Sequence, residues 1–228
     1  MGLLNDPRVE GLLARLHAQS TGQNQDVMSY VMSRVQEGTL DWKSGFDQGM
    51  HQFMSDKLIA LEPDKAEFCY QLCRALRAKR VVEAGTSFGV STIYLASAVR
   101  ENLRRDGGSG VVIGTEHEPE KAAAASAHFA EAGLSDLIDL RVGDLRQTLA
   151  NLEGPIDFML VDIWTPMARP ALELVAPALR PGAIVVADNT TQFREAYEDY
   201  FAFIADPRHG LRTVTLPFEG GFELTVRD

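Results

Sequence analysis

The spacing of apolar and polar residues changes along the chain and predicts a helical N-terminal part followed by an alternating α/β part. Apolar residues recur every three or four positions over residues 3–18 and 27–35, as in amphipathic helices, with a break expected at residues 20–22. An early proline and acidic neighbours predict a further helix from Glu62 to about Leu76. From Arg80 onward, short β-branched runs alternate with helical patterns.

The alternating part predicts a mostly parallel β-sheet that helices cover on both faces. The expected parallel strands are residues 80–84, 111–116, 138–142, 156–162 and 183–188. The expected helices are residues 89–104, 119–132, 145–151, 169–179 and 192–205. Residues 211–216 and 222–226 flank a turn with proline and glycine, which predicts an antiparallel hairpin at the edge of a seven-stranded sheet. We therefore expect an α/β, Rossmann-like fold over residues 58–228, preceded by a helical extension over residues 1–57.

The composition limits the classes of function that are open to this chain. It has 228 residues, 45% of them hydrophobic and 24% charged, as expected for one folded domain, and no apolar run approaches a membrane span. A formal net charge of −10 argues against binding to nucleic-acid backbones. The first residues lack a secretory signal, so we expect a cytoplasmic protein. Cys69 and Cys73 lack redox or zinc spacing and are expected to be buried free thiols.

The stretch from Val81 to Ser91 predicts a cradle for a small molecule. It reads as a buried strand, a turn with Gly85 and Gly89, and the start of a helix. Glycine permits positive φ and a close approach of the backbone to a ligand, and a helix start offers unpaired amide donors.

Each predicted parallel strand has a carboxylate at or near its carboxyl end. These residues are Glu83, Glu116, Asp144, Asp162 and Asp188, the last followed by Asn189. Ligands bind at these ends in open α/β sheets. Capping of the next helix or turn explains any single one about equally well. The five together favour a binding site.

The glycine spacing separates two classes of nucleotide ligand. A nicotinamide cofactor requires G-x-G-x-x-G and an acid about 20 residues later. Here the pattern is Gly85-x-x-x-Gly89, and Glu116 lies much farther along. An acid at the second strand end can still accept both ribose hydroxyls, and Asp144 can meet an adenine amino group. The pattern favours an adenosine-bearing ligand without a pyrophosphate.

Together these motifs resemble those of the class I S-adenosylmethionine-dependent methyltransferases. The residues that carry the resemblance are Glu83-x-Gly85-x-x-x-Gly89, Glu116, Gly143-Asp144, residues 156–162 and residues 185–189. More narrowly, residues 58–228 are similar to the metal-dependent O-methyltransferases typified by catechol and caffeoyl-CoA O-methyltransferases. The resemblance implies a Rossmann-like methyltransferase fold. It also implies an enzyme that transfers a methyl group from S-adenosylmethionine to a hydroxyl, one of a vicinal pair on a small, aromatic or similar acceptor.

The resemblance also implies which residues bind the cofactor. The expected cofactor-binding residues are Glu83, Gly85, Ser87, Gly89, Ser91, Glu116, Asp144 and Trp164. Glu83, Gly85, Ser87 and Ser91 would lie around the methionine part, and Glu116 would bind the ribose. Asp144 and Trp164 would flank the adenine, although Trp164 has the alternative role of a core or lid aromatic.

A divalent cation is the second ligand that the resemblance implies. In the family, the aspartate after the fourth strand and the Asp-Asn pair after the fifth bind it, which corresponds to Asp162, Asp188 and Asn189. Their oxygens are hard donors that suit Mg²⁺, Ca²⁺ or Mn²⁺. The cation would hold the acceptor and lower the pKa of its hydroxyl, so that Asp162 would act in catalysis through the metal.

One position departs from the family pattern. Thr165 stands three residues after Asp162, where the family usually has a lysine as the proposed general base. Either the cation alone acidifies the acceptor, or His51, Lys57 or Lys65 reaches in, or the protein is not a catechol-type catalyst. A metal-independent methyltransferase of another nucleophile and a non-catalytic cofactor-binding protein therefore stay open.

The expected partner is a small hydroxylated acceptor, with no nucleic acid and no membrane. The N-terminal helices predict a lid or a dimer surface, and the sequence permits either a homodimer or a monomer.

Overall fold

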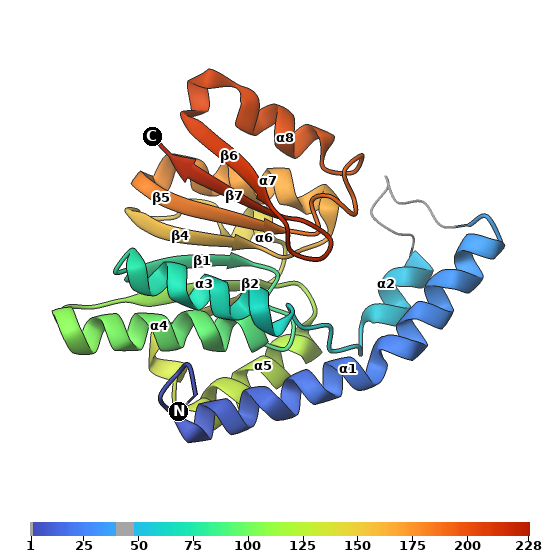
Figure 1. Cartoon of the computed structure of the whole chain (residues 1–228), viewed down its shortest axis with the longest axis horizontal. Helices are drawn as coiled ribbons and strands as arrows, with labels where there is room; N and C mark the ends of the chain where they lie inside the picture. The colour runs from blue at the N-terminus through green and yellow to red at the C-terminus, as the bar shows by residue number, and fades with distance from the viewer. Residues whose placement is uncertain (1, 40–47) are drawn as a thin grey trace.

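A seven-stranded β-sheet with helices on both faces forms the body of the molecule (Figure 1). The computed structural model describes residues 2–39 and 48–228. The strands are β1 (Arg80–Ala84), β2 (Val111–Glu116), β3 (Ile138–Val142), β4 (Ile156–Val161), β5 (Leu179–Asp188), β6 (Leu211–Leu216) and β7 (Phe222–Arg227). Their order is β3-β2-β1-β4-β5-β7-β6, and only β7 runs antiparallel to its neighbours. The predicted Rossmann-like fold is confirmed.

The helices form a layer on each face of the sheet. One layer holds α3 (Pro63–Ala75), α4 (Val90–Asp106) and α5 (Pro119–Ala132), and the other holds α6 (Leu145–Thr148), α7 (Thr165–Val175) and α8 (Glu198–Ala205). Side chains alternate between the two faces along a strand, so Val81 joins the first apolar cluster and Val82 joins the second. Cys69 and Cys73 of α3 are buried free thiols, as predicted.

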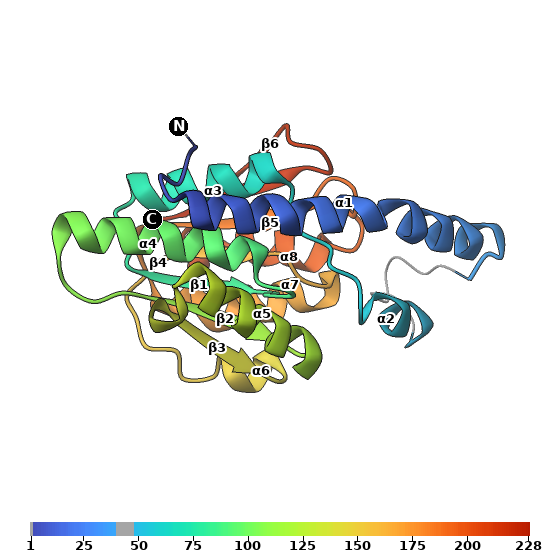
Figure 2. The same ribbon diagram turned by 90° about the horizontal axis from the view of Figure 1, so that it is seen from below.

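The N-terminal part consists of a long helix, α1 (Pro7–Gln36), and a short helix, α2 (Gln48–Met54). The first half of α1 packs on the body through a buried stripe of Val9, Leu12, Leu13 and Leu16. The second half projects beyond the body, with α2 beside it (Figures 1 and 2). None of the described helices has both the length and the apolar character needed to cross a membrane.

The predicted break at residues 20–22 is wrong, because α1 continues through it. One glycine in a helix costs only about 1 kcal/mol. Contacts from a distant segment stabilise this part of α1: the amide of Ala60 donates to Ser20 Oγ at 3.1 Å, and that of Leu58 donates to Gln23 Oε1 at 2.8 Å.

The starts of helices α7 and α8 differ from the predictions. Helix α7 begins at Thr165, four residues early, because Pro166 takes an early helical position. Helix α8 begins only at Glu198. The amides of Thr191 and Gln192 donate to the carbonyl of Gly220 at 2.9 and 2.8 Å, which holds this segment against the β6–β7 loop in place of a helix.

Candidate functional site

A cavity of about 860 Å³ lies at the carboxyl ends of the parallel strands. It spans the ends of β1 and β4, where the strand order reverses and where such sheets bind their ligands. Its volume falls within the range of roughly 300–1,000 Å³ that is typical of small-molecule sites. The predicted site residues on its wall are Gly85, Ser87, Ser91, Glu116, Asp144, Asp162, Trp164, Thr165, Asp188 and Asn189. The structure therefore brings most of the predicted residues to one cavity.

Gly85 and Gly89 shape the turn between β1 and α4. Their φ angles are +98° and +85°. A Cβ atom on Gly85 would lie 1.9 Å from the carbonyl oxygen of Asp162, and one on Gly89 would lie 2.4 Å from the ring of Phe129. Because only glycine tolerates both the backbone angle and the approach, the turn sits directly against the end of β4.

Glu83 supports this turn from beneath and is not on the cavity wall. It is fully buried, and its carboxylate accepts hydrogen bonds from Ser91 Oγ at 2.6 Å, Thr86 Oγ1 at 2.9 Å and the hydroxyl of Thr92. Burial raises the pKa of Glu83, although the three hydroxyl donors oppose the shift. The contacts of Glu83 and Gly89 with a cofactor stay predictions.

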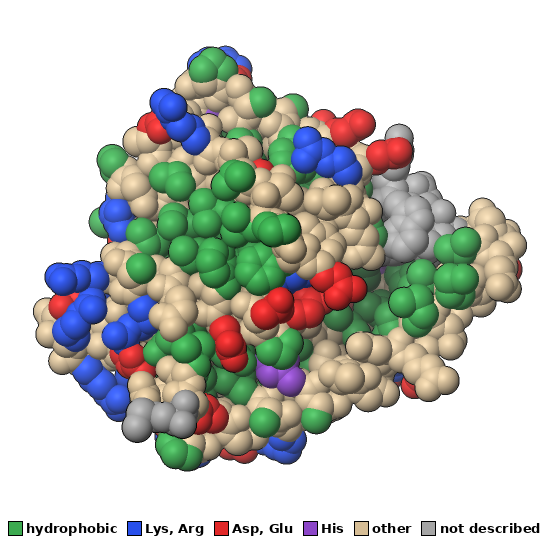
Figure 3. Space-filling view, viewed as in Figure 1, with side chains coloured by type: hydrophobic (Ala, Val, Ile, Leu, Met, Phe, Trp, Pro, Cys, Tyr) green, Lys and Arg blue, Asp and Glu red, His purple; other side chains and the backbone are tan. Residues whose placement is uncertain are grey.

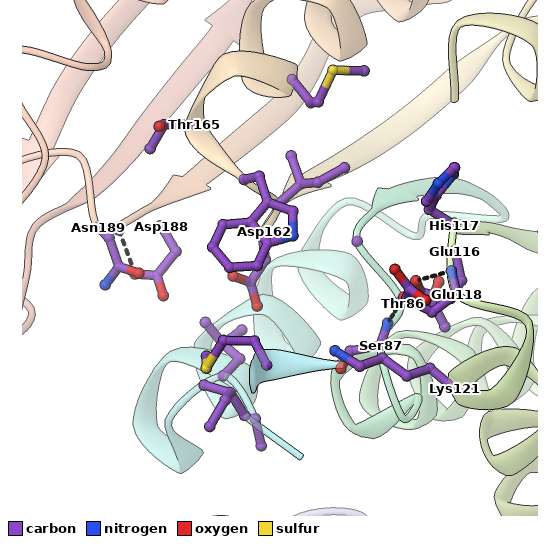
Figure 4. Close-up of a pocket in the computed structure, with 18 of the residues that line it drawn as sticks. Thr86, Ser87, Glu116, His117, Glu118, Lys121, Asp162, Thr165, Asp188 and Asn189 are labelled. Carbon is purple, nitrogen blue, oxygen red and sulfur yellow. Dashed lines mark hydrogen bonds between the residues drawn. The ribbon is translucent and has the colours of Figure 1, made fainter. Parts of the chain in front are cut away.

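Glu116 receives a backbone amide on each of its carboxylate oxygens (Figure 4). Ser87 N–H donates to Oε2 at 2.7 Å, and Glu118 N–H donates to Oε1 at 2.8 Å. These bonds join the glycine turn to the end of β2. A carboxylate offers about four acceptor positions. Acceptor positions therefore remain for the predicted ribose hydroxyls.

Asp144 and Trp164, the two residues predicted to flank the adenine, both lie on the cavity wall. Asp144 caps α6, and its ion pair with Arg146 lowers the pKa of Asp144 to about 2. The ring centroid of Trp164 lies 4.6 Å from that of His51 in α2, at an angle of 48°. Trp164 thus contacts the N-terminal part, as the alternative role of a lid aromatic requires.

Asp162 and Asp188 occupy equivalent positions at the ends of neighbouring strands. The parallel register pairs Val161 with Ala187, so the next residue on each strand reaches the same edge of the sheet. Burial and the negative charges of Asp188 and Glu83 raise the pKa of Asp162 well above its usual range. The side chain of Asp162 has no hydrogen-bond partner within residues 2–39 and 48–228.

Lys65, in the first turn of α3, places its ammonium group on Asp188. Lys65 Nζ lies 2.6 Å from Asp188 Oδ1 and 2.9 Å from Glu62 Oε2, and only 1% of the side chain is exposed. Burial lowers the pKa of Lys65, but hydrogen bonds to Asp188 and Glu62 outweigh it and raise that pKa overall. Burial raises the pKa of Asp188 to about 6, although the hydrogen bond and the charge of Lys65 oppose the rise.

The donor set for the predicted divalent cation is incomplete in this arrangement. Asp162, Asp188 and Asn189 offer hard oxygens, which suit Mg²⁺. However, Asp188 Oδ1 already accepts from Lys65 at 2.6 Å and from the amide of Asn189 at 2.7 Å. With the Lys65 ammonium on Asp188 Oδ1, a divalent cation fits poorly here, because it would share this carboxylate with a like charge.

The three side chains proposed from the sequence to replace the family lysine lie in different places. Lys65 reaches Asp188, and His51 lies on the cavity wall. Lys57 pairs with Asp56 at 2.6 Å and is not on the wall. Thr165 lines the cavity, but Figure 4 shows it well apart from the carboxylates of Asp162 and Asp188.

The sequence did not single out part of the cavity wall. Helices α1 and α2 add a largely apolar side with Val27, Val31, Met50 and Met54, and Lys121 adds a cation near Glu116. The helical spacing over residues 27–35 was a signal of an apolar face, but it carried no information about what the face covers.

Comparison with known proteins shows what this fold and site resemble. Residues 82–190 match a family model described as "Methyltransferase domain". This part of the chain therefore resembles a methyltransferase domain.

Known relatives agree with this assignment. The chain is 31% identical over 135 residues to a catechol O-methyltransferase of Niastella koreensis, covering 58% of each protein. It is 33% identical over 132 residues to a catechol O-methyltransferase of Mycobacterium tuberculosis, covering 58% of this chain and 57% of that one. The matches thus span little more than half the length of these relatives. The resemblance stated from the sequence is confirmed.

A solved structure agrees in fold. The crystal structure of the O-methyltransferase TomG from Streptomyces achromogenes, in complex with SAM, aligns with a TM-score of 0.66 at 24% identity. The alignment covers 78% of this chain and 85% of TomG.

Proposed function

We propose that this protein transfers the methyl group of S-adenosylmethionine to a hydroxyl group of a small acceptor. The observation that carries the proposal is a single cavity with two kinds of wall. The glycine turn and Glu116 form one side, and the carboxylates of Asp162 and Asp188 form the other. The named O-methyltransferase relatives support the same reaction.

The two sides of the cavity receive different molecules in this proposal. The cofactor binds along the ends of β1 and β2, where Glu116 receives the ribose and Asp144 and Trp164 enclose the adenine. The acceptor binds beside the ends of β4 and β5. The apolar side chains of α1 and α2 on the wall suit an aromatic body, and a vicinal diol on such a molecule is the acceptor class that we expect.

The transfer itself is a displacement at the methyl carbon. A lone pair of the acceptor oxygen forms the new O–C bond while the C–S bond breaks and its electron pair stays on sulfur, giving S-adenosylhomocysteine. The hydroxyl proton is released to solvent. Asp162, whose carboxylate is unpaired among the described residues, accepts the hydrogen bond of the hydroxyl and orients it. Holding the two reactants in line contributes much of the rate.

The N-terminal part acts in this proposal as a lid over the acceptor. Helix α2 contacts the site through His51 and Trp164, whose rings lie 4.6 Å apart.

A homodimer is a separate prediction, supported by the exposed side chains of Met28, Met32 and Val35 on the projecting half of α1. A monomeric mass in light scattering would remove it. Cytoplasmic location also stays a prediction, and the divalent cation predicted from the sequence is not part of this proposal.

Titration calorimetry with S-adenosylhomocysteine tests the cofactor half of the proposal. We expect one site per chain with micromolar affinity, and no detectable binding would overturn the proposal. Transfer of labelled methyl groups to a panel of phenols, catechols and aliphatic diols then tests the acceptor half. Cofactor binding without turnover on any of them would favour the non-catalytic alternative.

A further inference from the structure

We infer that the ammonium group of Lys65 takes the place of a divalent cation beside Asp188, and that the protein works without a bound metal ion. The inference deepens the proposed function and rests on it for the reaction. It is based on the arrangement of charges at the ends of β4 and β5. Metal binding at this place can be measured without any turnover.

Lys65 places a positive charge on Asp188, one of the three residues that the predicted cation would contact. Its Nζ atom lies 2.6 Å from Asp188 Oδ1, the nearer of its two carboxylate partners, and 2.9 Å from Glu62 Oε2. The amide of Asn189 donates to the same Asp188 oxygen at 2.7 Å. Asp188 Oδ1 therefore has two donors already. A metal ion could bind this oxygen only by displacing one of these donors, and on Asp188 Oδ2 it would share the carboxylate with the ammonium.

The surroundings hold Lys65 in this position. Its side chain is 1% exposed, and Nζ lies 6.0 Å from the ring centroid of Phe222 at the start of β7. Asn102 of α4 fixes the other end of α3 through hydrogen bonds of 3.0 and 2.9 Å to the carbonyls of Cys73 and Ala78. Moving the ammonium away would leave Asp188 buried without its positive partner, which is unfavourable.

The surrounding charge favours a fixed ammonium at this position. Acidic side chains gather over the N-terminal end of α3, where Glu62, Asp64 and Glu67 are exposed (Figure 3). The ammonium has three donors, and Asp188 and Glu62 use two of them. A divalent cation on Asp188 would have to share that carboxylate with a like charge, and the repulsion is strong in a buried place.

Lys65 is therefore a positioning residue, since it is not on the cavity wall and acts through Asp188. It fixes the orientation of that carboxylate and offsets its charge. A purely structural lysine would not control metal binding. If Lys65 excludes a cation, removing its charge must create a metal site that depends on Asp188.

The first test counts bound metal ions. Wild-type protein and Asp188→Asn, both stripped with EDTA and dialysed, are titrated with Mn²⁺, and the free ion is followed by electron paramagnetic resonance. We expect both proteins to bind Mn²⁺ equally, through weak surface sites only. One additional saturable ion in the wild type that Asp188→Asn removes would overturn the inference.

The second test removes the ammonium group while keeping a similar side-chain length. We expect Lys65→Met to gain one saturable Mn²⁺ ion, bound at least tenfold tighter than by the wild type, and Lys65→Met/Asp188→Asn to lose it. The control Lys57→Met removes the exposed pair with Asp56 and should gain nothing. No gain in a folded Lys65→Met protein would show that Lys65 does not exclude the cation. If that variant fails to fold, the comparison of wild type with Asp188→Asn still decides.

The third test measures the rate of methyl transfer, once an acceptor is known. Initial rates of the wild type should agree within twofold in excess EDTA and in millimolar Mg²⁺. A tenfold loss in EDTA would overturn the inference. Failure of the proposed function is distinguished by the calorimetric titration with S-adenosylhomocysteine, because the Mn²⁺ counts require neither cofactor nor turnover.

Discussion

The two sides of the cavity are built in different ways. On the side of β1 and β2, residues close in sequence build the site: Glu83, Gly85 and Ser91 lie between the end of β1 and the start of α4. On the side of β4 and β5, the carboxylate of Asp188 depends on Lys65, which is 123 positions away, and on a wall formed by α1 and α2.

The difference assigns separate roles to the two sides. Hydrogen bonds fully engage Glu83 beneath the turn and join Glu116 to it, as suits a rigid site for one fixed cofactor. The other side has an unpaired carboxylate, Asp162, and an apolar wall contributed by the N-terminal part. In our proposal, acceptor choice and the need for a metal are therefore decided on the β4–β5 side.

The largest effect should come from breaking the contact between the two sides at Gly85. We expect Gly85→Ala to destabilise the protein by about 3 kcal/mol and to abolish binding of S-adenosylhomocysteine, because its Cβ would meet the Asp162 carbonyl. Gly38→Ala is the control, since Gly38 also has positive φ but no atom of the described residues lies near its Cβ position; it should cost about 1 kcal/mol. If urea unfolding showed equal losses of unfolding free energy in the two variants, the close packing at Gly85 would be contradicted.

Removal of the Lys65 charge should be the next largest effect and should act on the β4–β5 side. We expect Lys65→Met to lower the free energy of unfolding by about 2–3 kcal/mol, because it leaves Asp188 buried without its partner. Lys57→Met, which breaks an exposed pair, should change it by less than about 1 kcal/mol. Urea unfolding at pH 7.5 measures both. Similar small losses would show that the buried pair contributes no more than a surface pair.

The variant Glu116→Gln tests the cofactor side of the cavity. This change keeps the shape but removes the charge that binds two backbone amides and, in our proposal, the ribose. Calorimetry should show S-adenosylhomocysteine binding about 10- to 100-fold more weakly, a loss of about 1.5–3 kcal/mol. Glu120→Gln, an exposed carboxylate in α5, should bind as the wild type does. An unchanged affinity for Glu116→Gln would remove Glu116 from the cofactor site.

The smallest effect concerns how α1 is attached to the body. Asp6 accepts hydrogen bonds from the amides of Arg8 and Val9 at the helix start and from Arg100 of α4. We expect Asp6→Ala to cost about 1 kcal/mol and to leave cofactor affinity within twofold. Burial opposes ionisation, but these bonds and the Arg100 charge lower the pKa of Asp6 below 3.8 overall.

The pH dependence of this effect follows from the lowered pKa. The contribution of Asp6 is fully present above the unfolded-state pKa and is lost as the pH falls through the lower folded-state pKa. The difference in unfolding free energy between the wild type and Asp6→Ala should therefore be constant above about pH 5 and shrink below pH 4. A difference that grows as the pH falls would contradict this.

The fold was predictable because its signals are local. Short β-branched runs, glycine turns and an early proline predicted the strands and α3, and the parallel register brings Asp162 and Asp188 to one edge. The break expected at residues 20–22 was wrong because contacts from Leu58 and Ala60 support the helix there. Such support comes from a segment that the local pattern does not include.

The site was predictable to the extent that it lies at strand ends. Lys65 was one of three candidates to reach in from the N-terminal part, and no spacing rule distinguished it from His51 or Lys57. Its pairing with Asp188 depends on how α3 packs over the sheet, which is set by tertiary contacts. The role of α1 and α2 as a cavity wall was hidden for the same reason.

The most direct test of the account is a calorimetric titration of the EDTA-treated wild-type protein with S-adenosylhomocysteine, repeated with Glu116→Gln. The account predicts one site per chain with micromolar affinity in the wild type and binding at least tenfold weaker in the variant. No detectable heat of binding in the wild type at cofactor concentrations up to the millimolar range would contradict the account.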